Sequence, residues 1–86
     1  MRVRVRKIGN ASHPSEVVVQ VKTIEGIVDF VVDKHSLDAN ETVSIGVPVS
    51  RKSGLWQIEL PCETTRGFRR VWVKASALAP ERWRTT

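Results

Sequence analysis

The segment from Arg66 to Lys74 combines the residue types that a polyanion-binding site needs. Phe68, Arg70, Trp72 and Lys74 alternate along it, so an extended chain places all four on one face. Basic side chains neutralise phosphates, and an exposed indole offers a surface on which a nucleobase stacks. This face therefore predicts binding of nucleic acid or another polyanion. Further basic residues that could extend the site are Arg66, Arg69, Arg51 and Lys52.

The prediction depends on the direction in which Trp72 points. If Val71 and Val73 face the core, Trp72 stands outside between two basic side chains. If Trp72 faces the core instead, this site does not exist. Trp56 shares its own face with Ile58 and with no charged residue of its strand, which favours Trp56 as the core tryptophan and Trp72 as the surface one.

Catalysis would have to use Cys62, His13 and His35 as nucleophile and base. Their spacing matches no nucleophile–base motif and no common pattern of zinc ligands. The sequence also lacks a phosphate-binding loop and a dinucleotide fingerprint. We therefore predict that the protein is not an enzyme and has no catalytic residue, metal site or cofactor.

A protein partner is the alternative to a nucleic acid. Exposed Trp72 and Trp83, each beside arginines, could anchor such a partner, because Trp and Arg dominate binding hot spots. Residues 2–8 also alternate and could pair edge to edge in a homodimer, which leaves the oligomeric state open. Salt separates the two classes, since phosphate contacts weaken steeply with ionic strength and an aromatic protein interface does so less.

The composition describes one small globular domain. The chain has 86 residues, of which 41% are hydrophobic and 27% charged. Its net charge of +5 is uneven: residues 11–41 carry two basic and six acidic groups, whereas the two ends are basic. No apolar run of about 20 residues could span a membrane, and the charged N-terminus does not match a secretory signal. A single cysteine is consistent with a reducing compartment, and we expect a cytoplasmic protein without a membrane partner.

The elements that must position these residues are strands. Apolar residues alternate with polar ones in the runs 2–8, 16–23, 27–33, 42–50, 55–60 and 68–74. Gly26 and Gly54 mark turns between these runs. A bulge is expected near Arg6, where the alternation of the first run breaks. In the run 42–50, Val47 and Val49 are expected to face inward. The segments 33–41 and 74–79 hold at most one helical turn each. The prediction is an all-β domain over residues 1–79, a small barrel or rolled antiparallel sheet of five or six strands, followed by a mobile basic tail at 80–86.

Residues 54–78 resemble the second half of a Src-homology-3-like (SH3-like) barrel. In that family a Trp opens a strand, a Gly-containing loop follows, and the next strand ends in a short 3₁₀ turn before a hydrophobic residue. Trp56, Gly67, Val73 and Leu78 occupy the matching positions. The resemblance implies an SH3-like barrel, but the aromatic groove for proline-rich peptides is missing, since Gln57 and Lys74 replace its residues and the chain has no Tyr.

Overall fold

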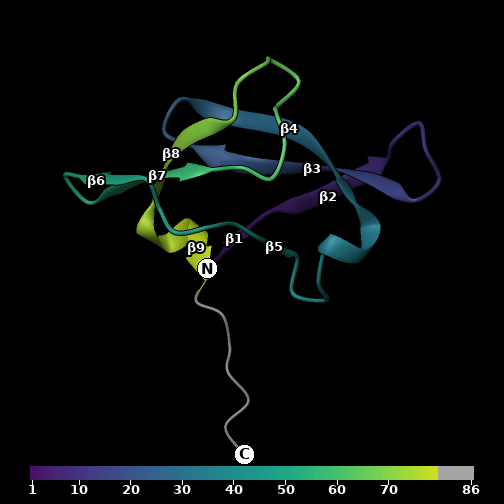
Figure 1. The fold of residues 1–86 in the computed structure, drawn as a ribbon, viewed down its shortest axis with the longest axis horizontal. Coiled ribbons are helices and arrows are strands. Elements are labelled where there is room, and N and C mark those ends of the chain that lie inside the picture. The colour runs from purple at the N-terminus through teal and green to yellow at the C-terminus, as the bar shows by residue number, and fades with distance from the viewer. Residues whose placement is uncertain (80–86) are drawn as a thin grey trace, which may run out of the picture.

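The computed structural model describes residues 1–79, so the predicted tail at 80–86 lies outside the described residues (Figure 1). Within residues 1–79 the regular structure consists of strands and two 3₁₀ turns, without an α-helix. In chain order the elements are β1 (Arg2–Arg4), β2 (Arg6–Asn10), β3 (Glu16–Thr23), β4 (Gly26–Asp33), η1 (Lys34–Ser36), β5 (Thr42–Ser44), β6 (Ser50–Lys52), β7 (Leu55–Glu59), β8 (Arg70–Lys74), η2 (Ala75–Ala77) and β9 (Leu78–Ala79). The prediction of an all-β fold with one or two short helical turns is confirmed.

The strands form three antiparallel sheets of three strands each, in the orders β5-β1-β9, β2-β3-β4 and β6-β7-β8. None of the three sheets closes into a barrel within residues 1–79. The predicted number of five or six strands is wrong, because two of the continuous runs are interrupted and a short ninth strand, β9, follows η2 in the segment 74–79. Val5 separates β1 from β2, residues 45–49 separate β5 from β6, and η2 separates β8 from β9.

The longest hairpin is formed by β3 and β4, which cross the upper half of the fold in Figure 1. Val17, Val19 and Val21 alternate toward the core, as expected of a half-buried strand of β-branched residues. The chain reverses at Gly26, whose φ of 121° lies in the region that side chains other than glycine rarely adopt. The predicted hairpin over residues 16–33 is therefore confirmed.

The N-terminal run contains the predicted irregularity. The chain leaves the strand at Val5, and the register between β2 and β3 shifts between Lys7 and Gly9. Ile8 lies at this bulge, is 46% exposed and does not join the core. β1 is the central strand of its sheet, with β5 and β9 on either side, so its backbone has no free edge for the predicted pairing in a dimer. β2 is an edge strand of its own sheet, so residues 6–8 are the part of the run 2–8 that could pair in this way.

The inward direction predicted for Val47 and Val49 is wrong. The two side chains are 89% and 44% exposed. β5 ends at Ser44 and Ile45 is still buried, but Pro48 has no backbone N–H with which to continue a ladder, so the alternation is lost over residues 47–49. Thr42, which the alternation places outward, is buried instead at the start of β5.

A polar network explains the burial of Thr42. Its hydroxyl accepts a hydrogen bond from Arg2 Nε at 2.7 Å and donates one to Asp38 Oδ2 at 2.8 Å. Asp38 Oδ1 accepts the backbone N–H of Thr42 at 2.8 Å and that of Asn40 at 3.1 Å. These hydrogen bonds, the bond from the Thr42 backbone first, lower the pKa of Asp38. Arg2 is thereby committed to the fold and does not serve as a free surface cation.

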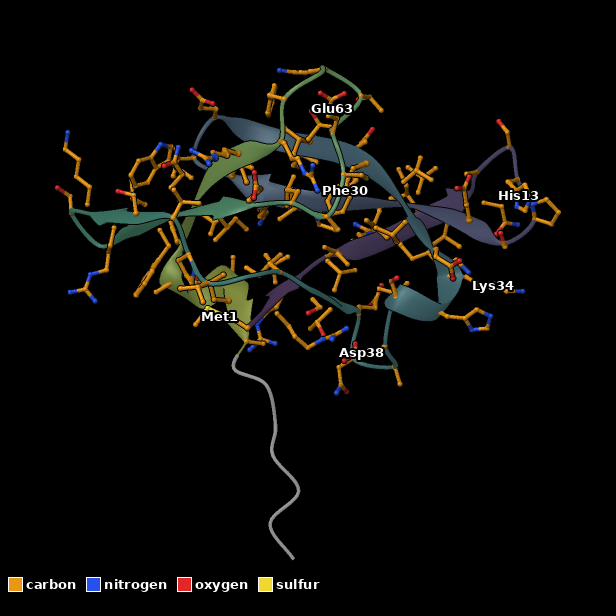
Figure 2. All side chains as sticks on the ribbon, viewed as in Figure 1. Met1, His13, Phe30, Lys34, Asp38 and Glu63 are labelled. Carbon is orange, nitrogen blue, oxygen red and sulfur yellow. The ribbon has the colours of Figure 1, made fainter. Side chains whose placement is uncertain are left out.

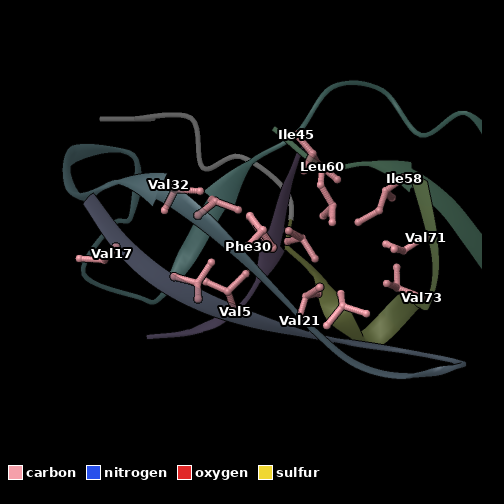
Figure 3. Packing of buried hydrophobic residues seen from close by; sticks show 14 residues of the cluster. Val5, Val17, Val21, Phe30, Val32, Ile45, Ile58, Leu60, Val71 and Val73 are labelled. Carbon is pink, nitrogen blue, oxygen red and sulfur yellow. The ribbon is translucent and has the colours of Figure 1, made fainter. Parts of the chain in front are cut away.

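All three sheets contribute to one hydrophobic core (Figure 3). Its buried members are Val3, Val5, Val17, Val19, Val21, Val28, Phe30, Val32, Val43, Ile45, Ile58, Leu60, Val71 and Val73. Phe30, the largest of them, is completely buried. Trp56 is half-buried and packs against this cluster, as predicted.

Candidate functional site

β8 points in the direction that the binding hypothesis requires. Val71 and Val73 are 4% and 0% exposed and belong to the core. Trp72, between them in the sequence, therefore lies on the opposite face of the strand and is half-buried. Arg70 and Lys74, on the same face as Trp72, are exposed.

The register of the sheet shows which side chains surround Trp72. Gln57 of β7 lies directly opposite Trp72, and Leu55 lies opposite Lys74. Lys52 of β6 lies opposite Leu55 on its other side, so two lysines flank this leucine. We call the surface formed by Ser50, Lys52, Leu55, Gln57, Glu59, Arg70, Trp72 and Lys74 the outer face.

Arg70 contributes less to the outer face than its sequence position suggests. Its Nε lies 3.7 Å from Glu59 Oε2, and the two side chains are 56% and 49% exposed. An ion pair this exposed contributes about 0–1 kcal/mol to stability. The carboxylate nevertheless offsets the charge of Arg70, which leaves Lys52 and Lys74 as the cations of this face without an acidic partner among residues 1–79.

Phe68 does not extend the outer face. Phe68 precedes β8 and packs against the core. The preceding loop places it there. Gly67 has a φ of 87°, and the N–H of Thr64 donates to Phe68 O at 2.8 Å, so the chain folds back over the core. The arrangement that placed Phe68 one step along from Trp72 is thus wrong.

The remaining predicted cations serve other contacts. Arg69 donates from Nε to Leu60 O at 2.9 Å and from Nη2 to Pro61 O at 3.0 Å, which fastens the 61–69 loop. The Arg51 guanidinium lies 5.0 Å from the ring centroid of Trp56, a cation–π distance, on the face opposite Trp72. Arg66 is exposed in the 61–69 loop. Of the eight predicted residues, four share the outer face: Lys52, Arg70, Trp72 and Lys74.

A groove of about 720 Å³ begins where the outer face ends. Four basic side chains line it: Arg4, Arg6, Lys22 and Lys74. Its lining residues, within the part of the chain that the structure describes, include no acidic side chain. We call this feature the basic groove, and Lys74 belongs both to it and to the outer face.

The break between β1 and β2 creates the basic groove. β2 pairs with β3 only as far as Arg6 opposite Gln20, so the end of β3 extends beyond it. There the N–H of Ile24 donates to Trp72 O at 3.0 Å, which brings the hairpin turn against β8. Arg4 Nε donates to Ser76 O in η2 at 3.3 Å and ties β1 to this wall.

Of the four groove cations, the sequence-based prediction included Lys74. Arg4 and Arg6 share a face of their run, but nothing in the sequence brings them to Lys74. Lys22 was missed, because its outward position in β3 is typical of a solvated strand residue. The only available signal was the basic character of both ends of the chain, which meet here across the β3–β4 hairpin.

The candidate catalytic side chains are not brought together. Figure 2 shows His13 in the β2–β3 loop, well separated from Glu63, the neighbour of Cys62. The half-buried thiol of Cys62 donates to Val31 O at 2.8 Å, and burial raises its pKa, so the reactive thiolate is disfavoured. His13 Nδ1 lies 2.6 Å from Ser15 Oγ and accepts the backbone N–H of Ser15 at 3.2 Å, contacts that order the loop locally.

Residues 1–79 lack two further kinds of feature. These residues contain no group of three or more His, Cys, Asp or Glu side chains that could hold a metal ion, and no helix long and apolar enough to cross a membrane. The chain matches no family model, no curated protein and no solved structure. The outer face and the basic groove are therefore the features from which a function has to be argued.

Proposed function

We propose that this protein is a non-enzymatic binding module for a polyanion, with nucleic acid as the favoured ligand. The proposal rests on one observation: Trp72 lies on an outer face whose cation Lys74 also lines a groove with three further basic side chains. Phosphates would be neutralised by these cations, and the indole would contact a base. Each base–aromatic contact is worth about 1–3 kcal/mol.

We further infer that the three sheets together form an SH3-like small barrel. The 3₁₀ turn η2 precedes Leu78, and Leu78 packs against the core, in the order that the resemblance of residues 54–78 implies. A single core shared by the three sheets supports the same inference. Within this proposal the protein is cytoplasmic, since its thiol at Cys62 is free.

The test is an NMR titration of the ¹⁵N-labelled protein with short single-stranded DNA and RNA at low and moderate salt. We expect the indole N–H of Trp72 and the amide of Lys74 to shift in a saturable way. Trp56 is the internal control, because its ring faces away from the outer face and is covered by Arg51. Signals that do not move on the outer face or in the groove would reject the proposal.

A protein partner is the second candidate. Ile24 and Ile27, both beside the basic groove, are 48% and 52% exposed, and apolar side chains of this size are typical of interface centres. Such a partner would bind with a weak salt dependence, whereas a polyanion would be released by salt. Sedimentation of the free protein over a range of concentrations tests the homodimer, which would be one form of this partner.

A further inference from the structure

The cations of the basic groove are available to a ligand. Within residues 1–79, the side chains of Arg6, Lys22 and Lys74 form no hydrogen bond or ion pair. The fourth, Arg4, is held only by its bond to Ser76 O, which is 3.3 Å long and leaves its terminal nitrogens free to bind an anion. The groove is thus a concentration of positive charge that the fold does not neutralise.

The lining between these cations is apolar. Val5 and Val21, which Figure 3 shows at one margin of the core cluster, lie at the base of the groove but are only 9% and 1% exposed. Ile24 and Ile27 add two aliphatic side chains that are about half exposed. A site for phosphate alone gains nothing from such a floor, whereas a nucleobase buries its flat apolar faces against it.

One polar group of the groove could contact the edge of a base. Gln20 is half-buried, and its amide forms no side-chain hydrogen bond within residues 1–79. An amide of this kind offers both donors and an acceptor. Thr23 is not available in the same way, because its hydroxyl donates to Gly26 O at 2.7 Å within the hairpin turn. On β4, Asp29 lies directly opposite Gln20, but this acidic residue does not line the groove.

The groove and the outer face adjoin. Lys74 belongs to both, and the bond between Ile24 N–H and Trp72 O joins the apolar wall to the strand that carries the indole. A ligand that stacks a base on Trp72 would place its next phosphates at Lys74. Bases in a duplex are paired and stacked on one another, so they cannot present their faces to the indole or to the isoleucines.

We propose that the ligand is single-stranded nucleic acid and that the basic groove holds one unstacked nucleotide. Its base lies against Ile24 and Ile27, and its phosphates lie at Lys22, Lys74 and the two arginines, next to the nucleotide that stacks on Trp72. A volume of 720 Å³ falls within the usual range of about 300–1,000 Å³ for ligand pockets. This inference rests on the proposed function and narrows its ligand class.

A direct comparison of ligands tests the inference. A fluorescein-labelled DNA single strand of about 10 nucleotides, within the usual site size of ~4–16, is titrated with the full chain. The matched duplex and inorganic polyphosphate then serve as competitors. We expect the single strand to bind at least about tenfold more tightly than either, since only it offers both phosphates and free base faces. Equal binding of all three would overturn the inference and leave polyanion binding intact, and no binding by any of them would overturn both.

Two matched pairs of variants locate the contact. Ile24→Ser should weaken single-strand binding by about three- to tenfold through lost apolar contact and leave polyphosphate binding unchanged. Ile8→Ser is its control, because Ile8 is 46% exposed, against 48% for Ile24, but does not line the groove. Lys22→Gln should weaken both ligands, and Lys34→Gln, which removes the same charge at the other end of the β3–β4 hairpin, should weaken neither. An equal loss in Ile24→Ser for both ligands, or no loss, would refute the base contact.

Discussion

Salt should weaken ligand binding by an amount that the charge of the basic groove determines. The groove carries four basic side chains and, among the described residues, no acidic one. Each cation that neutralises one phosphate of a single strand adds about 0.7 to the negative slope of log K against log salt concentration. Four such contacts give a slope of about −2.8, so that an increase from ~50 to ~200 mM salt should weaken binding about 50-fold.

Removal of one groove cation should change this slope by a defined step. In Lys22→Gln the expected slope is about −2.1, and the same increase in salt should weaken binding only about 20-fold. Lys22 suits this purpose because it is exposed at the end of β3 and makes no contact that the fold requires. The change should therefore alter affinity without unfolding the protein. Cations of the outer face, such as Lys52, would make both slopes steeper but leave their difference the same.

Fluorescence anisotropy of the labelled single strand, measured at four salt concentrations, gives the slopes. Lys34→Gln is the matched control, since Lys34 is exposed in η1 and distant from the groove lining. Its slope should equal that of the unmodified protein. The reasoning would be refuted by a slope shallower than about −1, or by equal slopes for the Lys22 and Lys34 variants.

Four further outcomes are expected. Trp72→Ala should weaken binding of the single strand by about five- to 150-fold, the range for one lost base–aromatic contact, with little change in the urea midpoint. Phe30→Ala should lower the free energy of unfolding by about 3–5 kcal/mol in urea titrations, because it removes a completely buried ring. The pKa of Asp38 is lowered in the folded protein, so its ionised carboxylate stabilises the fold fully above the ordinary Asp pKa, and this stabilisation is lost as the pH falls through the pKa of the folded state. Asp38→Asn should therefore remove this part of the loss of thermal stability at acidic pH, as measured by thermal melts. Cys62 should react more slowly with a thiol reagent at pH 8 in the folded protein than in urea, because burial raises its pKa.

The sequence predicted the elements better than their arrangement. Strict alternation in residues 16–33, with Gly26 between the two runs, was sufficient to predict the hairpin of β3 and β4 and its buried face. The same rule held for Ile45 but failed for Val47 and Val49, which follow the end of β5 and face solvent. Alternation is a consequence of strand geometry, so it loses its meaning at the residue where the strand ends.

For the candidate site, too, alternation predicted only the residues that lie within a strand. The face of Trp72 followed from its neighbours Val71 and Val73, because adjacent residues of one strand must point in opposite directions. Phe68, in contrast, lies before the strand begins, and Arg51 lies on the other side of its sheet, over Trp56. Neither position can be derived from one segment, since each depends on where a turn or a neighbouring strand places it.

The basic groove could not have been predicted, because its cations come from distant parts of the chain and meet only through the fold. Bringing Arg4, Arg6, Lys22 and Lys74 together places like charges near one another, which opposes folding unless an anion is present. The sequence contains nine acidic residues that could have neutralised them, yet none lines the groove within residues 1–79. Glu59 pairs with Arg70 on the outer face, so the fold does place a carboxylate beside a cation elsewhere. Four unneutralised cations around a partly apolar lining do not help the domain to fold, and this is the observation that supports the proposed anionic ligand.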